Sequence, residues 1–121
     1  MPIDYEIRPE IDCIFVTLTG VIEDADLLTA QREMFTDSLF VGHYTRLIDA
    51  SACDRLAVDA YTVHSVAKAA EKRGLRRAAL VAPDDVVYGL MRMYENYVAD
   101  ADCAVFRDIG DAIAWLAPAR R

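Results

Sequence analysis

The sequence predicts an α/β fold in which helices pack against a mixed β-sheet. Its 121 residues fit a single domain, since domains most often contain about 100–150 residues. Two strand patterns come first with no helix between them, and short apolar strands then alternate with helical patterns. No repeat, linker or low-complexity segment divides the chain. We therefore predict one domain over residues 1–121, with the element order ββαβαβαβα and about four helices.

The first two elements are predicted to form a β-hairpin. Ile3, Tyr5 and Ile7 alternate with polar neighbours, which is typical of a half-buried strand. Residues 13–19 alternate in the same way, and Gly20 is predicted to end this second strand. Because only a short turn separates the two strands, we expect them to pair antiparallel.

The apolar spacing then changes to that of a helix, which Asp24 or Asp26 can begin. Its apolar residues are Leu27, Leu28, Met34 and Phe35. Residues 40–46 predict a loop. A short strand follows, centred on residues 47–48 and ending at Asp49.

A second helix is predicted over residues 58–73, because Gly74 follows at the usual C-terminal position. Its buried side would consist of Val58, Thr62, Val63, Val66, Ala67 and Ala70. Asp59 falls within this apolar arc, in the first turn, where a carboxylate can accept hydrogen bonds from free backbone N–H groups. Capping is therefore the simpler interpretation of Asp59, and a functional role is the alternative. The apolar run at 78–82 predicts a central parallel strand.

The third helix, predicted over residues 83–98, has a wide apolar arc of about 160°. The arc contains Val86, Val87, Leu90, Met91, Met93, Tyr94, Tyr97 and Val98. Burial in the core is the simpler explanation. The arc is wider than an ordinary core stripe, and the additional apolar residues can also cover another helix, a dimer partner or an apolar ligand.

The opposite side of this helix carries Tyr88, Gly89, Arg92 and Glu95. Arg92 and Glu95 are spaced for an i, i+3 ion pair, which is the simpler interpretation. Tyr and Arg are also typical anchors of protein interfaces, so a recognition surface is the alternative. Gly89 costs about 1 kcal/mol relative to Ala inside a helix, which indicates close approach of another backbone or of a ligand.

The last elements are a strand at 104–106 and a helix that Asp108 caps. The apolar residues of this helix are Ile109, Ile113, Trp115 and Leu116. Because helices separate the later strands, we expect those strands to be parallel and joined by right-handed crossovers.

Polar residues follow several strands, at the edge where open α/β sheets bind ligands. Asp49 and Ser51 lie at one strand end, and Asp85, Arg107 and Asp108 lie near two others. Carboxylates at such an edge can hold Mg²⁺. Asp85 and Asp108 stand directly before helices, however, where Asp is a preferred N-cap, so no metal site is predicted.

The charge balance disfavours two classes of partner. The net charge is −7 and the pI is near 4.7, which argues against nucleic acid and against adsorption to anionic membranes. The basic residues do cluster once, at Lys72, Arg73, Arg76 and Arg77. Because this cluster falls at a helix end, interaction with the helix dipole is its simpler explanation, and an anion site is the alternative.

Three cysteines, Cys13, Cys53 and Cys103, are far apart and form no CxxC pair, so neither a zinc site nor a redox pair is predicted. We expect Cys13 and Cys103 to be small core residues of strands. No signal peptide is recognisable and no apolar run is long enough to span a bilayer, so we expect a cytoplasmic protein. No nucleotide-binding motif is present, and no cofactor is predicted.

Four segments carry a resemblance to a known family, and they are LIDAS at 47–51, RGLRRAALVAP at 73–83, YGLMRMYE at 88–95 and VFRDIGDAIAWL at 105–116. These segments resemble the SpoIIAA-like (STAS/SEC14-type) group of small bacterial proteins. With the hairpin, the resemblance covers nearly the whole chain. It implies an α/β, SpoIIAA-like (STAS-like) single domain.

The better-known relatives are anti-sigma-factor antagonists, which bind a partner kinase and are switched by phosphorylation of a serine in a DSSG-like motif. Asp49 and Ser51 resemble the strand end before that motif. The next helix begins LAVDAYT here, so the serine and the following glycine are absent, and Asp59 lies close to the serine position. The SEC14-type likeness implies instead an apolar or lipid-like ligand between helices and sheet.

We therefore expect a non-enzymatic regulatory or protein-interaction module that binds a protein partner or self-associates. The alternative is a carrier or sensor of a small apolar ligand, which a cavity near Leu90, Met91 and Tyr94 would support. An enzyme ranks third, because no suitably placed base is evident for Ser51 or Cys53.

Overall fold

The fold follows the predicted order of elements. A computed structural model describes residues 2–75, 77–98 and 102–117. The strands are β1 (Ile3–Arg8), β2 (Cys13–Glu23), β3 (Thr45–Ala57), β4 (Arg77–Val81) and β5 (Asp102–Phe106). The helices are α1 (Asp24–Thr36), α2 (Ala60–Lys72), α3 (Asp85–Tyr97) and α4 (Ile109–Leu116), and a 3₁₀ turn (Pro9–Ile11) joins β1 to β2. The predicted order ββαβαβαβα is confirmed within these residues.

The five strands form one mixed sheet in the order β1-β2-β3-β4-β5. β1 and β2 pair antiparallel, with Ile3 opposite Leu18, so the predicted hairpin is confirmed. β3, β4 and β5 each run parallel to the strand before them. β4 has a parallel partner on both sides, and four of its five residues are buried, as expected for an apolar strand in the middle of an α/β sheet.

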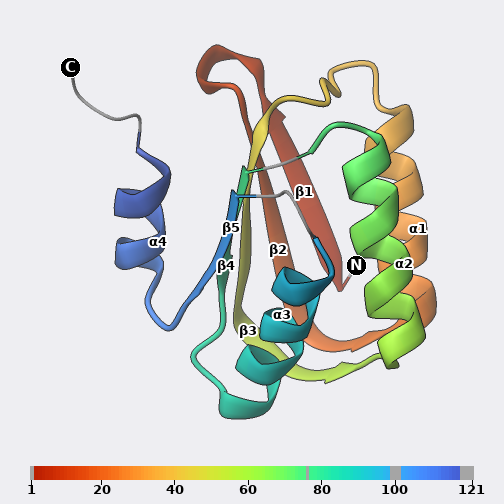
Figure 1. Cartoon of the computed structure of the whole chain (residues 1–121), viewed down its shortest axis with the longest axis vertical. Coiled ribbons are helices and arrows are strands. Elements are labelled where there is room, and N and C mark those ends of the chain that lie inside the picture. Colours follow the sequence, from red (N-terminus) through yellow and green to blue (C-terminus); the bar gives the residue numbers. More distant parts are fainter. Residues whose placement is uncertain (1, 76, 99–101, 118–121) are drawn as a thin grey trace.

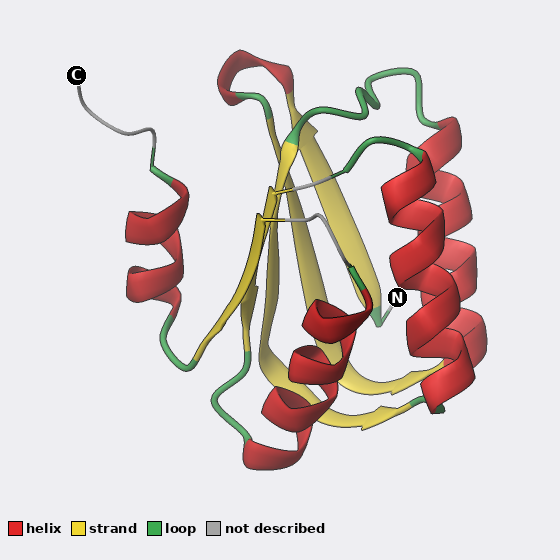
Figure 2. Cartoon of the chain, viewed as in Figure 1, coloured by secondary structure: helices red, strands yellow, loops and turns green. Residues whose placement is uncertain are grey.

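The helices cover the two faces of the sheet unequally. Figure 1 shows α1, α2 and α3 along one face and α4 alone on the other. Figure 2 shows the sheet between these two helical layers. We call the two sides the three-helix face and the α4 face. The three-helix face holds most of the core, including Leu18, Ile22 and Val63. The buried cluster of the α4 face is small and consists of Leu47, Ala79, Val81 and Ala112.

Strands β2 and β3 extend further than predicted. β2 continues through Gly20, which takes a φ of 72° at a shift in register, because glycine adopts this conformation without steric cost. β3 does not end at Asp49. Its pairing with β4 stops there, but it stays paired with β2 as far as Ala57. Asp54 and Arg55 are polar residues in this extension, so the sequence lacks the pattern of a strand there.

β3 also begins earlier than predicted. Thr45 and Arg46 belong to the strand rather than to the loop expected at 40–46. Strand alternation then places Arg46 and Ile48 on the three-helix face, whereas Leu47 packs on the α4 face. A charged side chain is therefore directed into the larger core.

Aspartates cap three of the helices. Asp59 is the N-cap of α2, and its Oδ1 accepts a hydrogen bond from the Thr62 N–H at 2.8 Å, so the capping interpretation is confirmed. Asp84, rather than Asp85, caps α3. Asp108 caps α4 as predicted.

Two arginines of the basic cluster make contacts within the protein. The Arg73 guanidinium lies over the Phe35 ring at 4.6 Å. The Arg77 guanidinium lies over the Trp115 ring at 3.9 Å and forms an ion pair with Asp102. Arg76 lies outside the described residues. These contacts give the arginines a structural role at the ends of α2 and β4.

Candidate functional site

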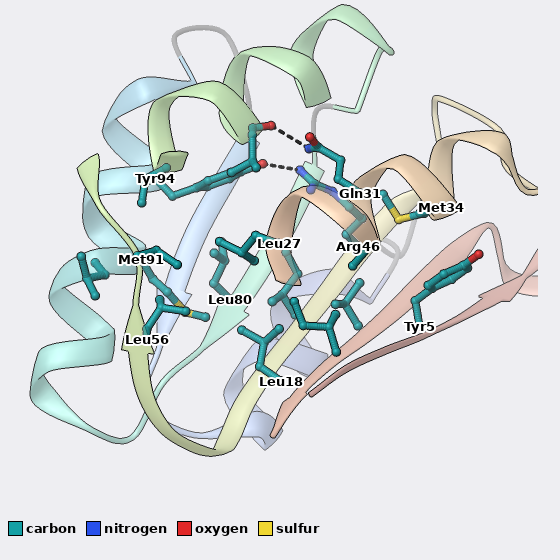
Figure 3. Close-up of a pocket in the computed structure, with 18 residues that line it drawn as sticks. Tyr5, Leu18, Leu27, Gln31, Met34, Arg46, Leu56, Leu80, Met91 and Tyr94 are labelled. Atoms are coloured by element: carbon teal, nitrogen blue, oxygen red, sulfur yellow. Dashed lines mark hydrogen bonds between the residues drawn. The ribbon is translucent and has the colours of Figure 1, made fainter. Parts of the chain in front are cut away.

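An apolar pocket lies between the sheet and the three helices that cover its larger face. Its volume is about 120 Å³. Eighteen residues line it, drawn from β1 to β4, from α1 to α3 and from the segment before α2 (Figure 3). Fourteen of them are aliphatic or methionine side chains. We call this cavity the three-helix pocket.

Regular spacing brings the lining side chains to one place. Those of α1 follow the i, i+3, i+4, i+7 positions of one helix face and are Leu27, Ala30, Gln31 and Met34. α3 contributes Leu90, Met91 and Tyr94. These three residues come from the apolar arc predicted for this helix, and the cavity lies where the ligand-binding hypothesis requires one.

Only some residues of the apolar arc predicted for α3 are buried in the core. Val87, Met91 and Tyr94 are buried, as the pattern predicts. Val86 was expected in the same arc but is 71% exposed, because it lies in the first turn of α3, at its solvent side.

The charged residue among the pocket-lining side chains is Arg46. It is only 6% exposed. Its Nη2 donates a hydrogen bond to the Tyr94 hydroxyl at 2.9 Å, and its guanidinium carbon lies 5.8 Å from the centre of the Tyr94 ring. Its Nε is buried without a hydrogen-bond partner in the described part of the chain. Figure 3 shows the Arg46 head, the Gln31 amide and the Tyr94 hydroxyl together at one end of the pocket.

No carboxylate of the described residues forms an ion pair with Arg46. Glu95, which follows Tyr94 on α3, pairs with Arg92 instead. Cys103 of β5 lies near enough to sense the Arg46 charge. Burial raises the pKa of the Cys103 thiol to about 12, although the positive charge of Arg46 acts in the opposite direction. The thiol is therefore neutral, and it does not compensate the buried cation.

The residues predicted on the outer side of α3 do come together. Arg92 Nε lies 2.8 Å from Glu95 Oε1, so the expected ion pair is present. A hydrogen bond with the Tyr88 side chain, together with the charge of Glu95, raises the pKa of Arg92. The Arg107 guanidinium lies 4.0 Å from the centre of the Tyr88 ring and pairs with Asp85 at 2.6 Å. The result is a continuous polar surface along α3, which we call the α3 outer surface.

Gly89 lies in the middle of that surface without a close neighbour. A Cβ added at Gly89 would meet no atom within 4 Å in the described residues. The close approach of another backbone that its helical position led us to expect is therefore not made by the described residues. A ligand or partner at Gly89 stays a prediction.

Asp49 and Ser51 form a separate, local arrangement on β3. Asp49 Oδ1 accepts hydrogen bonds from the Ser51 N–H at 2.9 Å and from the Ser51 hydroxyl at 2.6 Å. Ser51 is exposed, and no hydrogen bond or ion pair joins the two residues to the α3 outer surface in the described ranges. Within those ranges, no group of three or more acidic, histidine or cysteine side chains could hold a metal ion.

Comparisons with known proteins point to one fold. No family model matches the sequence, and no curated protein matches it significantly. An uncharacterised DUF3478-family protein of Shewanella loihica, described as having a SpoIIAA-like fold, is 20% identical, with a TM-score of 0.59 over 94% of this chain and 91% of that chain. This chain has a SpoIIAA-like fold.

Two further structures agree with this assignment. The anti-sigma factor antagonist SpoIIAA in its unphosphorylated form is 10% identical, with a TM-score of 0.57 over 94% of this chain and 96% of that chain. A proposed anti-sigma factor antagonist of Thermotoga maritima is 14% identical, with a TM-score of 0.61 over 96% of this chain and 95% of that chain. The α/β SpoIIAA-like fold predicted from the sequence is thus confirmed, and at these identities the likeness concerns the fold alone.

Within this SpoIIAA-like fold, Asp59 occupies the head of α2 near the position where the resemblance places a phosphoacceptor serine. Hydrogen bonds from the backbone and side chain of Thr62, the backbone bond above all, lower the pKa of Asp59. The Asp59 N–H in turn donates to Asp24 Oδ1 at 3.1 Å. A fixed negative charge therefore stands at the start of α2.

Arg46 is the pocket residue that sequence reasoning missed. It was assigned to a loop because residues 40–46 contain a glycine, a histidine and polar side chains. The signal that could have revealed it is alternation, since Arg46 stands two residues before Ile48 in the strand. None of the helices in the described part of the chain combines the length and apolar character needed to span a bilayer.

Proposed function

We propose that this chain is a non-enzymatic binding module whose three-helix pocket takes up a small apolar ligand, as a sensor or carrier. The observation that carries the proposal is the pocket itself. It lies inside the larger core, its walls are almost entirely apolar, and it borders α1, α2 and α3 at once. A ligand in the pocket would contact α1, α2 and α3. Ligand binding would therefore change the position or the stability of this helical layer.

The volume sets the size of the ligand. An engineered apolar cavity of about 150 Å³ in another protein stays dry and binds benzene. A pocket of about 120 Å³ therefore suits an apolar group of roughly six heavy atoms.

The side chains suited to catalysis are engaged elsewhere, which supports a binding role. The Ser51 hydroxyl donates to Asp49. The His64 ring packs edge-on against Tyr97, with ring centres 4.9 Å apart, and His43 packs against Tyr44 in the same way. The three free cysteines suit a reducing compartment, and we propose the cytoplasm as the location.

Filling the pocket tests this function. Ala30 lines the pocket on α1, whereas Ala114 is exposed on α4, so Ala30→Leu adds a leucine inside the pocket and Ala114→Leu adds one outside it. We expect 1-hexanol, titrated by calorimetry, to bind the wild type and Ala114→Leu and to lose binding to Ala30→Leu. Absence of binding to the folded wild type, or equal binding to both variants, would contradict the proposal.

A second candidate function is protein interaction through the α3 outer surface. It is favoured by the joined side chains of Tyr88, Arg92 and Glu95, flanked by the exposed Val86. Tyr and Arg often supply interface anchors. The partner would be another protein or a second copy of this chain.

The double variant Tyr88→Ala/Arg92→Ala tests that surface. We expect it to abolish specific crosslinks in an extract of the source cells, or a dimer detected by light scattering. Arg32→Ala removes an exposed arginine from α1 and serves as the control. Crosslinks or dimers that persist in the double variant would exclude the α3 outer surface.

A further inference from the structure

We propose that the natural ligand of the three-helix pocket is a small apolar carboxylate, and that Arg46 binds its anionic head. This inference rests on the proposed function of the pocket and adds the chemical class of the ligand. It also assigns Arg46 as a specificity residue.

The Arg46 guanidinium has no carboxylate partner among the described residues. Arg46 is 6% exposed, and buried charges in proteins are ordinarily paired, because removing an ion from water without a partner is expensive. In the described residues its guanidinium donates to the Tyr94 hydroxyl, and no carboxylate pairs with it. A ligand carboxylate would supply the absent charge.

The Arg46 guanidinium also has an N–H donor without an acceptor among the described residues. An arginine offers five N–H donors in a planar fork that matches two carboxylate oxygens. The Nε of Arg46 is buried and has no partner among the described residues. An apolar ligand without an acceptor would leave this donor unsatisfied. A ligand carboxylate would accept from it once the Arg46 side chain turned Nε toward the pocket, since this atom has almost no exposed surface.

Arg46 lies at one end of a pocket that is lined mostly by apolar side chains. Figure 3 shows Arg46, Gln31 and the hydroxyl of Tyr94 at one end of the pocket, with Leu27, Leu80 and Leu18 beyond them. Gln31 already donates its amide to the Val66 carbonyl at 2.9 Å. The layout therefore fits a molecule with one anionic end and an apolar body, and Arg46 is the charged donor at the end where the anionic group would lie.

The volume of the pocket limits the size of the carboxylate. A body of roughly six heavy atoms fits about 120 Å³. The ligands whose apolar body fills this volume are short-chain or aromatic carboxylic acids.

The test compares two probes of equal chain length, hexanoate and 1-hexanol, on the intact protein by calorimetry at neutral pH. A charge-assisted hydrogen bond to a buried arginine favours hexanoate, and we expect it to bind at least about tenfold more tightly than 1-hexanol. In Arg46→Met, which keeps an unbranched side chain, we expect this preference to disappear while 1-hexanol still binds. Arg46→Lys keeps the charge and should retain part of the preference.

The outcomes separate this inference from the function on which it rests. If the wild type binds 1-hexanol as tightly as hexanoate, or more tightly, the carboxylate assignment is overturned and the apolar pocket stands. If neither probe binds, the proposed pocket function fails as well. Should Arg46→Met fail to fold, the comparison of the two probes on the wild type still decides the ligand class. A preference for hexanoate that survives in folded Arg46→Met would place the anionic head elsewhere and overturn the role of Arg46.

Discussion

The two faces of the sheet are covered in different ways. On the α4 face, Leu47, Ala79, Val81 and Ala112 are at most 4% exposed and form one small buried cluster. On the three-helix face, the helices leave a pocket of about 120 Å³ and enclose the guanidinium of Arg46. Filled contacts stabilise a fold, and atoms that border a void lose part of their dispersion energy. Under the proposed function, the α4 face contributes stability and the pocket of the three-helix face takes up the ligand.

The largest expected effect compares one leucine from each face. Leu47 and Leu80 lie on neighbouring strands and are 4% and 3% exposed. We expect Leu47→Ala to lower the free energy of unfolding by about 3 kcal/mol, as for a well-packed core leucine. We expect a smaller loss, of about 2 kcal/mol, for Leu80→Ala, because Leu80 borders the pocket and its atoms on that side face a void. Urea unfolding measures both values, and a larger loss at Leu80 would contradict the comparison.

A smaller effect concerns the stability of the three-helix layer itself. Gly89 weakens α3, and an added Cβ would meet no atom of the described residues within 4 Å. We therefore expect Gly89→Ala to raise the free energy of unfolding by about 0.5–1 kcal/mol. Gly20 is the control, because its φ of 72° makes Gly20→Ala destabilising even though space is available. A destabilised Gly89→Ala would show that this glycine serves a contact within the fold.

The smallest effect concerns the cap of α2, another helix of this layer. Asp59→Ala should lower the free energy of unfolding at neutral pH, because the Thr62 N–H loses its acceptor. The pKa of Asp59 is lowered in the folded protein. Its stabilisation is thus fully present above the ordinary Asp pKa and is lost as the pH falls through the lowered value.

Urea midpoints of wild type and Asp59→Ala, compared at neutral and at strongly acidic pH, measure this change. The difference between the two proteins should shrink in acid. Asp59→Ser keeps a capping oxygen that does not titrate, so its midpoint should lie between the other two at neutral pH. A difference that grows on acidification would exclude the capping role.

Most of the fold could be predicted because its signals act over a few residues. The alternation of Ile3, Tyr5 and Ile7 defines β1, and the capping residue Asp108 marks the start of α4. The second half of β3 could not be predicted in this way. It is held by pairing with distant residues of β2, across the irregular register near Gly20, and its own side chains lack an alternating pattern.

The candidate site was predictable only in part, for a related reason. Leu90, Met91 and Tyr94 could be singled out because they share one face of one helix. The pocket, in contrast, depends on how α1, α2 and α3 are spaced above the sheet, which no single segment encodes. The place of Arg46 in the pocket depends on its burial beside Tyr94. Tyr94 is 48 residues away in the sequence, so local patterns do not reveal this contact.

The central claim is that ligand binding belongs to the three-helix face alone. The most direct measurement is a titration of methyl-labelled protein with 1-hexanol, followed by NMR, because the neutral probe reports on the pocket whatever the head group of the natural ligand. We predict saturable shifts of the Leu80, Leu90 and Val63 methyl signals and no shifts at Leu47 and Val81 on the α4 face. Saturable shifts at Leu47 and Val81, or none at the pocket methyl groups, would contradict the account.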